Sequence, residues 1–189
     1  CPESWAGKCH ALRIGAEHAE GDMLAFIDAD TEAHPDLLRA AVGEAKRRDT
    51  ALLSLLTDLK SCHWFERCTQ PVATMALMSL FPPDRVNRDD RARTFANGQF
   101  MLFDRDWYEE VGGHAAVKND LLEDIAFAQV ISKAGGRVNI LQSDGLLACS
   151  MYGTREEFLR GWMRIFLEAT SRGCKALRKQ SRRQLLVGW

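Results

Sequence analysis

The residues of this chain best suited to chemistry are two aspartates that follow a short apolar segment. Residues 24–31 read LAFIDADT, which places Asp28, Asp30 and Thr31 directly after a run typical of a buried strand. Open α/β sheets bind their ligands beyond the carboxyl ends of strands, where this segment would deliver both carboxylates. Two carboxylates there suit either an aspartyl nucleophile or hard oxygen ligands for a divalent cation, and an Asp-capped turn is the purely structural alternative.

A second acidic pair, Glu123 and Asp124, opens a stretch with helical periodicity. Residues 122–136 repeat apolar positions at helical spacing and end in a double glycine, a common helix C-terminus. A carboxylate at the start of such a helix can serve as a general base, but acids there also stabilise the helix dipole. Both roles remain open on these residues alone.

Two further positions are candidates for contact with a ligand. Gly98 and Gln99 stand at the mouth of an apolar stretch expected to be a strand, and a glycine there lets a ligand approach the backbone closely. Lys8 follows a glycine at the start of a helical stretch. A lysine in that place is either solvated or paired with a phosphate.

Helical and strand patterns alternate over the first part of the chain. We expect helices over 8–19 and 35–48 and strands over 23–28 and 50–59, because their apolar residues recur at helical spacing or form short uninterrupted runs. This alternation predicts an α/β fold with a mainly parallel sheet. A Met-rich helix is expected over 63–80, and its Met side chains are either core filler or an adaptable surface for an apolar ligand.

Composition bounds the class of protein. The chain has 189 residues, 46% of them hydrophobic, and a formal net charge of -1. These values favour one globular domain over residues 1–189 and give no electrostatic attraction to nucleic acid.

No apolar run approaches the roughly 20 residues that a spanning helix needs, so this chain alone is not expected to cross a bilayer. The tail, residues 166–189, is basic and suits a solvated surface or anionic lipid headgroups.

The spacing of Asp28 and Asp30 is shared with the nucleophile loop of haloacid dehalogenase-type phosphohydrolases, which depend on Mg²⁺. Such an enzyme also needs a downstream acidic pair for the cation, typically at the end of another apolar strand. The conspicuous later acids, Glu123 and Asp124, open a helix instead. The phosphohydrolase is therefore kept as an alternative of which the downstream half is missing.

Four separated motifs account for more of the chain. They are SWAGKCHAL at 4–12, DADTEAHPDLL at 28–38, ANGQFMLFDRDWYEEVGGH at 96–114 and LLEDIAFAQVISKAGGRV at 121–138. In this order they resemble the family 2 glycosyltransferases, and the resemblance covers about residues 4–165. It implies the GT-A fold, a Rossmann-like α/β domain with a mixed, mainly parallel sheet flanked by helices.

The resemblance also implies roles for particular residues. Asp30, with Asp28 beside it, would hold Mn²⁺ or Mg²⁺ against the diphosphate of a nucleotide sugar, and Asp124 would be the catalytic base of a transfer that inverts the anomeric configuration. The residues expected to contact the donor are Asp28, Asp30, Lys8, Gly98, Gln99, Glu123 and Trp162. Trp162 belongs to a helix expected over 158–166, for which amphipathic packing is the structural alternative.

The chain departs from the family pattern at its start. Family members begin with a βαβ unit that binds most of the nucleobase, and the given sequence starts at Cys1 without it. We therefore expect an N-terminally truncated catalytic domain that lacks the first βαβ unit. The base and the sugar of the donor cannot be inferred from the residues present.

The acceptor is expected to be a lipid or another apolar molecule, which follows from the Met-rich helix, the basic tail and the resemblance. The protein would then transfer a hexose-like sugar on the cytoplasmic side of a membrane. It would reach the membrane through peripheral contact or through a transmembrane anchor lost from this chain. A non-catalytic nucleotide-sugar-binding domain is the second alternative.

Overall fold

The computed structural model of the chain describes residues 5, 7–61, 63–88, 94–118, 120 and 122–169. The chain divides into two compact units, which are described separately below. Unit 1 comprises Cys1–Leu59 and Phe81–Cys149, and unit 2 comprises Lys60–Leu80 and Ser150–Trp189. Most of the expected basic tail lies outside the described residues. The single-domain division drawn from the sequence stays a prediction.

The main sheet of unit 1 has four strands in the order β1-β5-β3-β6. They are β1 (Met23–Ile27), β5 (Phe100–Asp104), β3 (Leu52–Leu56) and β6 (Val138–Gln142). Strand β5 is antiparallel to both β1 and β3, whereas β3 and β6 are parallel. Three strands therefore run in one direction and β5 runs against them. The expected α/β class with a mixed sheet is confirmed.

A small second sheet continues from the ends of these strands. It has the order β2-β7-β4, formed by Thr31–Ala33, Leu147–Cys149 and Asp58–Leu59. The single strand expected over 50–59 is thus two strands in two sheets, separated at Thr57. The small sheet lies directly after the carboxyl ends of β1 and β3, so it borders the end of the main sheet where ligands are expected.

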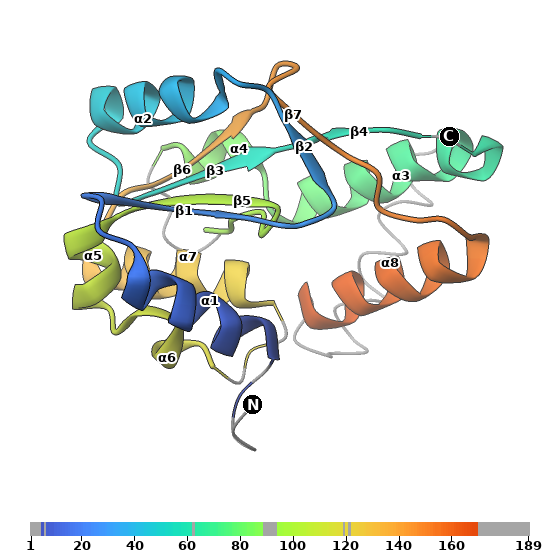
Figure 1. Ribbon diagram of the computed structural model, residues 1–189. Helices are drawn as coiled ribbons and strands as arrows, with labels where there is room; N and C mark the ends of the chain where they lie inside the picture. The colour runs from blue at the N-terminus through green and yellow to red at the C-terminus, as the bar shows by residue number, and fades with distance from the viewer. Residues whose placement is uncertain are drawn as a thin grey trace. The chain divides into compact units, whose positions relative to one another are not determined.

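Helices cover both faces of the main sheet (Figure 1). Helix α2 (Leu37–Arg48) lies on one face, and α1, α5, α6 and α7 lie on the other. The bounds of the latter four are Gly7–His18, Arg105–Glu110, Gly113–Ala116 and Glu123–Ala134, and the short helix α4 spans Pro83–Val86. Layers of helix on both sheet faces are the arrangement that the alternating sequence pattern predicts.

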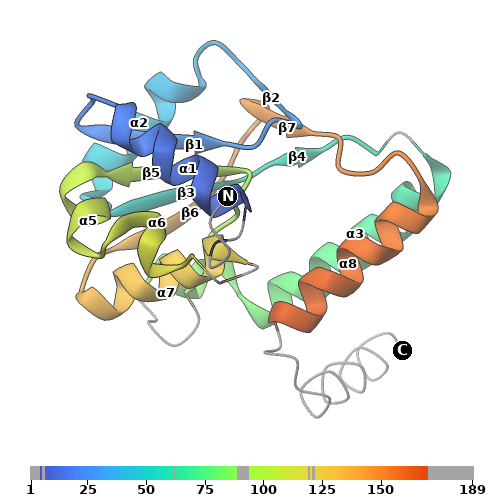
Figure 2. The same ribbon diagram turned by 60° about the horizontal axis from the view of Figure 1, so that its bottom comes forward.

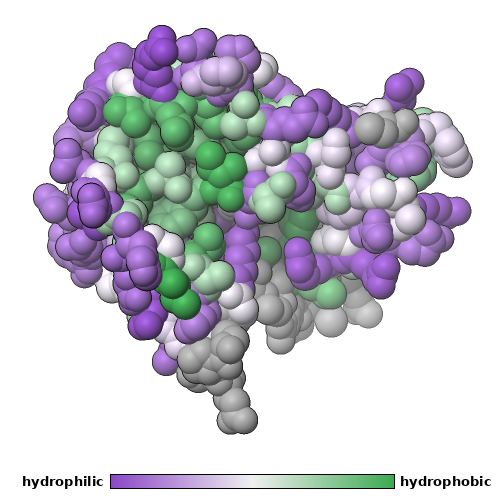
Figure 3. Space-filling model, in the orientation of Figure 1, coloured by the Kyte–Doolittle hydropathy of each residue, from purple (hydrophilic) through white to green (hydrophobic). Residues whose placement is uncertain are grey.

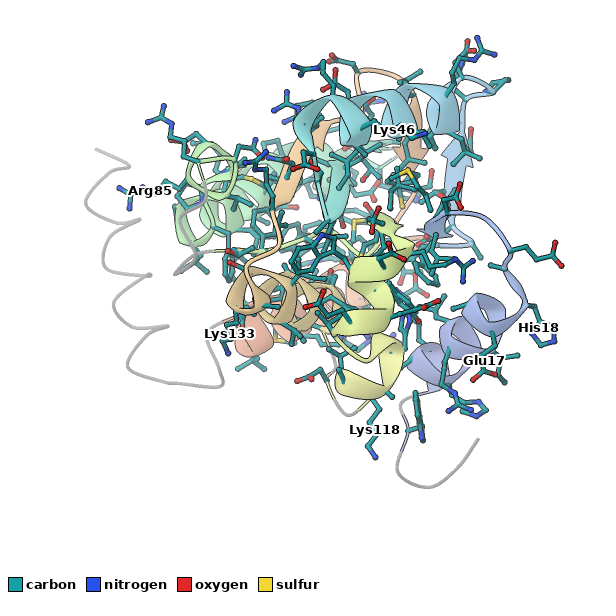
Figure 4. All side chains as sticks on the ribbon, turned by 90° about the vertical axis from the view of Figure 1, so that its left-hand side faces the viewer. Glu17, His18, Lys46, Arg85, Lys118 and Lys133 are labelled. Carbon is teal, nitrogen blue, oxygen red and sulfur yellow. The ribbon has the colours of Figure 1, made fainter. Side chains whose placement is uncertain are left out.

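The ends of the helices follow local chemistry. Helix α7 ends at Gly135, which has φ 101° and donates its N–H to Ile131 and Ser132 carbonyls, as glycine does in left-handed C-caps. Helix α2 begins at Leu37, two residues later than expected, because Pro35 lies in a turn closed by Leu37 N–H to the His34 carbonyl at 2.9 Å. Figure 4 shows Lys46 and Lys133, basic residues of the last turns of α2 and α7, pointing outward.

The core of unit 1 has a layer on each side of the sheet. On the α2 side, a buried cluster comprises Leu37, Ala41, Ala45, Leu53, Leu55, Phe100, Leu102 and Leu147. Strand β1 joins the other layer through Leu24 and Phe26, while Ala25 and Ile27 on its opposite face remain exposed. Figure 3 shows the resulting apolar surface between β1 and α2. The edge strand β1 is therefore covered along one face, whereas on its other face only Met23 packs against the α2-side cluster.

Unit 2 consists of a pair of helices in its described part. Helices α3 (Trp64–Leu80) and α8 (Arg155–Ala169) lie side by side (Figure 2). Phe65 packs edge-on against Phe158 with ring centres 5.8 Å apart. Helix α3 fits the Met-rich helix expected over 63–80, and within the described part of the chain no helix is long and apolar enough to cross a bilayer.

Candidate active site

Asp28 and Asp30 lie in a tight turn at the carboxyl end of β1. The Asp28 N–H donates to the Gln99 carbonyl at 3.2 Å, and the Asp28 carbonyl accepts from Thr31 N–H at 3.3 Å and from Thr31 Oγ1 at 2.7 Å. The turn between β1 and β2 is thus held on both sides by hydrogen bonds. It leaves Asp28 partly exposed and Asp30 exposed to solvent. Asp28 and Asp30 can therefore belong to a hydrogen-bonded turn and still reach a ligand.

Lys8 bridges two of the acidic motifs. Its Nζ lies 2.8 Å from Asp28 Oδ1 and 2.7 Å from Glu123 Oε1. Burial works to lower the pKa of Lys8, but the hydrogen bonds to Asp28 and Glu123 outweigh it and raise that pKa above its usual range. Burial likewise raises the pKa of Asp28, and the hydrogen bond from Lys8 opposes that rise. The first residues of α1 and α7 are thereby joined to the end of β1.

Asp124 is the most strongly perturbed carboxylate of the site. Its Oδ2 accepts from the Gly98 N–H and its Oδ1 from the Ile125 N–H, both at 2.8 Å. Burial, followed by the negative charge of Glu123, raises the pKa of Asp124 to about 6, although both hydrogen bonds favour the charged form. A carboxylate with a pKa near 6 is mostly ionised at neutral pH and basic enough to take a proton.

Gly98 lies tightly against the Asp124 carboxylate. A Cβ built on Gly98 would lie 3.1 Å from Asp124 Oδ2, closer than the great majority of real contacts. The sequence predicted a glycine that admits a ligand to the backbone, and the structure places the Asp124 carboxylate against that backbone. A role of Gly98 in contact with the donor stays a prediction.

The Gln99 carboxamide is turned into the protein. Its Oε1 accepts from Thr57 Oγ1 and, at 3.2 Å, from Asn97 Nδ2, while its Nε2 donates to Cys149 Sγ at 3.0 Å. Cys149 is buried, and it lies opposite Thr31 in the pairing of β2 with β7. Sequence reasoning missed Cys149, because a lone cysteine in a short strand carries no pattern that links it to a distant aspartate.

Trp162 belongs to unit 2, whereas the other seven residues expected at the site belong to unit 1. It is buried, its Nε1 donates to Gln70 Oε1 at 3.2 Å, and its ring lies 5.5 Å from that of Phe166. These contacts fit the amphipathic packing that was the structural alternative for this residue. Contact of Trp162 with a donor stays a prediction.

The donor atoms at the β1 turn suit a hard divalent cation. Carboxylate oxygens are preferred ligands of Mg²⁺ and Mn²⁺, and two carboxylates leave most coordination positions to phosphate oxygens and water. Among the described residues, no three His, Cys, Asp or Glu side chains are grouped as a ready metal site. Asp28 and Asp30 therefore fit a cation that arrives with a ligand better than one held by protein alone.

Comparison with known proteins places the chain in a family. The model of glycosyl transferase family 2 matches residues 1–112, so the chain belongs to this family. The sequence is 24% identical over 161 residues to 4,4'-diaponeurosporenoate glycosyltransferase of Staphylococcus aureus (strain MRSA252), with the same identity to the protein of strain USA300. These matches cover 84% of this chain and 43% of each relative.

A solved structure shows the same fold. The mannosyltransferase PcManGT from Pyrobaculum calidifontis, in complex with GDP-Man and Mn2+, matches with a TM-score of 0.60 and 20% identity, over 91% of this chain and 44% of that one. The GT-A architecture implied by the sequence motifs is thereby confirmed. The chain spans less than half the length of these relatives.

Proposed function

We propose that the protein containing this chain is a metal-dependent glycosyltransferase that moves a sugar from a nucleotide-diphosphate donor to an acceptor hydroxyl with inversion. The observation that carries the proposal is convergence at one end of the main sheet. Lys8, Asp28 and Glu123 form one ion-paired group, and Asp124 accepts a hydrogen bond from Gly98. Four motifs that are far apart in the sequence thus meet in one place, three through charged side chains and one through the backbone N–H of Gly98, as a shared donor site requires.

Asp30 and Asp28 are proposed to hold Mn²⁺ or Mg²⁺ together with the donor diphosphate. A divalent cation there would offset the negative charge that builds on the leaving diphosphate. Lys8 is placed to help, since its Nζ already lies 2.8 Å from Asp28. In the absence of a donor, Lys8 pairs with Asp28 and Glu123 and so offsets the repulsion between these two carboxylates.

Asp124 is proposed to accept the proton of the attacking acceptor hydroxyl. Its pKa of about 6 keeps it largely ionised at pH 7. The backbone N–H groups of Gly98 and Ile125 fix both carboxylate oxygens. A single base that activates the acceptor opposite the leaving group produces inversion, because displacement occurs in one step.

The acceptor is proposed to be a lipid or another apolar molecule reached at the cytoplasmic side of a membrane. The Staphylococcus relatives are described as acting on 4,4'-diaponeurosporenoate, and helix α3 exposes a face suited to lipid contact. Trp64 and Met75 on α3 are 76% and 72% exposed, and Val72 is also exposed. These residues recur at helical spacing, so they form one uncharged stripe along α3.

Calorimetry on the full-length protein tests the donor site directly. We expect Mn²⁺ to be required for binding of GDP-mannose or UDP-glucose, the two probes, and we expect Asp30→Ala to abolish that binding. Leu147→Val, a core change in β7, serves as the control and should bind like the wild type. Binding of either donor without metal in both wild type and Asp30→Ala would contradict the proposal.

The two alternatives give other outcomes. A non-catalytic domain would bind the donor with metal but never transfer sugar to any acceptor fraction, including extracted lipids. A phosphohydrolase would release phosphate from a phosphomonoester and would need Asp28 as nucleophile. The family match gives no support to the phosphohydrolase.

A further inference from the structure

Lys8 stands in the first turn of α1, where a positive charge is electrostatically unfavourable. The N-terminus of a helix carries a partial positive charge, so it favours a carboxylate and repels a lysine. The first turn of α1 contains no acidic residue. Lys8 Nζ instead lies 2.8 Å from Asp28 Oδ1 and 2.7 Å from Glu123 Oε1, which follow β1 and open α7. Two elements distant in the sequence therefore supply the charges that hold Lys8 in place.

The two partners of Lys8 differ in burial. The Glu123 side chain is 8% exposed, whereas that of Asp28 is 28% exposed and that of Lys8 is 43% exposed. A buried carboxylate that loses its positive partner is strongly destabilising, so Glu123 has to keep Lys8. Asp28 borders solvent and can exchange Lys8 for another cation. Glu123 is thus the permanent partner of Lys8, and Asp28 is the exchangeable one.

We propose that Glu123 is a positioning residue for Lys8, and that the Lys8 charge makes cation binding at Asp28 and Asp30 depend on the donor diphosphate. The inference rests on the proposed function, in which these two aspartates hold the cation. It gives the Glu123 side chain a role inside the protein in place of the contact with the donor that the sequence predicted.

The physical reason is that the electrostatic contribution of Lys8 changes sign with the ligand. An ammonium group and a divalent cation that share the Asp28 carboxylate repel one another, so Lys8 opposes a cation that comes alone. A nucleoside diphosphate brings several negative charges, which attract Lys8 away from Asp28. The same lysine therefore weakens the binding of a free cation and strengthens the binding of a cation together with its diphosphate.

Mn²⁺ binding to the full-length protein tests the role of Lys8 without measuring catalysis. Free Mn²⁺ is followed by electron paramagnetic resonance, first without nucleotide and then with saturating GDP or UDP, whichever the wild type binds. Lys8→Gln removes the charge but keeps a hydrogen-bond donor for Glu123. We expect this variant to bind Mn²⁺ alone roughly tenfold more tightly than the wild type, and Mn²⁺ with nucleotide roughly tenfold more weakly.

Two further variants serve as controls for the charge. Lys8→Arg keeps the positive charge and should behave like the wild type in both titrations. Lys133→Gln removes the same charge from an exposed residue of α7 that points outward (Figure 4), and it should change neither affinity. A role of Lys8 in packing alone would weaken Mn²⁺ binding in both titrations or in neither, so opposite changes identify the charge effect.

A double variant tests whether Glu123 acts through Lys8. Glu123→Gln should weaken nucleotide-dependent Mn²⁺ binding in the wild type, because Lys8 is then held by Asp28 alone, but should have little further effect in Lys8→Gln. The double variant also leaves no buried charge without a partner, so it replaces Lys8→Gln if that variant fails to fold. It should show the same opposite changes in the two titrations, and thermal unfolding is recorded for each variant.

The outcomes separate this inference from the proposed function. If removal of the Lys8 charge changes both Mn²⁺ affinities in the same direction, or changes neither, the role of Lys8 is overturned and the donor site stands. Equal losses from Glu123→Gln with and without Lys8 overturn the positioning role of Glu123. A wild type that binds no Mn²⁺ with either nucleotide overturns the proposed function itself.

Discussion

Asp124 combines a raised pKa with a fixed orientation, two properties that a general base needs together. Burial and, after it, the negative charge of the neighbouring Glu123 raise the pKa of Asp124, while the N–H groups of Gly98 and Ile125 hold both carboxylate oxygens. An acid that merely stabilised the helix dipole would be exposed in the first turn and would have an ordinary pKa. The environment of this residue therefore favours the catalytic role that the sequence left open.

Replacing Asp124 should separate binding from chemistry. Asp124→Asn preserves the shape but removes the basicity, so we expect metal-dependent donor binding to persist while transfer falls by roughly 10² to 10⁴. The amide can accept only one of the two backbone hydrogen bonds, so thermal unfolding is measured beside calorimetry and product formation. Wild-type rates of transfer in the variant would remove Asp124 from the role of base.

The same assignment predicts the pH dependence of transfer in the wild type. Because Asp124 must be ionised to accept a proton, the rate should fall about tenfold per pH unit below its pKa of about 6. Asp124→Asn should lose this acidic limb. A limb that persists unchanged in the variant would show that another group titrates.

His114 provides a second residue with a measurable signature. It is 0% exposed, its Nδ1 lies 2.7 Å from Tyr108 Oη, and its ring packs against Phe26 and Phe127. Burial lowers its pKa from 6.5 to about 4, although Glu123 opposes the shift. The folded protein therefore keeps this imidazole neutral at pH values where an unfolded chain would protonate it.

Stability should consequently fall as pH decreases from about 6.5 to about 4. In this range the unfolded His114 gains a proton that the folded one does not, which costs up to about 3 kcal/mol of the free energy of unfolding. Urea unfolding of wild type and His114→Phe across this range measures the difference, since the variant lacks the titrating group. Parallel pH profiles for the two proteins would contradict the lowered pKa.

Among the secondary-structure elements, β1 has one unpaired edge. The Asp28 N–H bonds to β5 through the Gln99 carbonyl, and the Arg105 N–H bonds to the Asp22 carbonyl. Since hydrogen bonds alternate along an antiparallel pair, the backbone groups of Met23, Ala25 and Ile27 point to the other edge. In the described part of the chain, no strand pairs with that edge.

The 189-residue chain is therefore expected to self-associate through β1. An apolar, uncharged edge strand is a template for pairing with another chain. Ala25→Lys places a charge on the exposed face of this strand and should shift the chain towards monomer in size-exclusion chromatography. Ala115→Lys, which adds the same charge on the exposed side of α6, should leave association unchanged. A wild type that is monomeric at all concentrations would refute this expectation.

Helix α3 gives an element-level test of the proposed membrane contact. The double variant Trp64→Ser with Met75→Ser removes two exposed apolar side chains, so binding to vesicles of anionic and neutral phospholipid should drop roughly tenfold. Ile14→Ser removes an exposed apolar side chain of α1 and should have no effect. The measurement is cosedimentation with vesicles, and equal binding by all three proteins would rule out α3 as the contact.

The bounds of helices and strands could be predicted where the local spacing of apolar residues determines them. Helices α1, α3 and α7 and strand β1 lie within one or two residues of their expected bounds, because apolar spacing and glycine signal them. The break at Thr57 was not predictable, since the apolar run continues through it. The antiparallel direction of β5 could not be predicted from the pattern of its residues either, because strand direction depends on which distant strands pair with it.

In the molecule as a whole, most of the residues expected at the site meet in unit 1, whereas Trp162 belongs to unit 2. The motifs around Lys8, Asp28, Gly98 and Asp124 converge as the resemblance implied. That Lys8 joins two acids could not be read from the sequence, because such contacts depend on three-dimensional packing. The inward orientation of Gln99 has the same origin.

The central claim is that this chain carries the donor site and the base of an inverting glycosyltransferase. The most direct measurement is NMR of the product formed by the full-length protein from a sugar nucleotide of known anomeric configuration, with and without Mn²⁺. An inverting, metal-dependent transfer gives a glycoside of opposite configuration that forms only with the metal. A product that retains the donor's configuration, or equal product in the presence of a chelator, would contradict it.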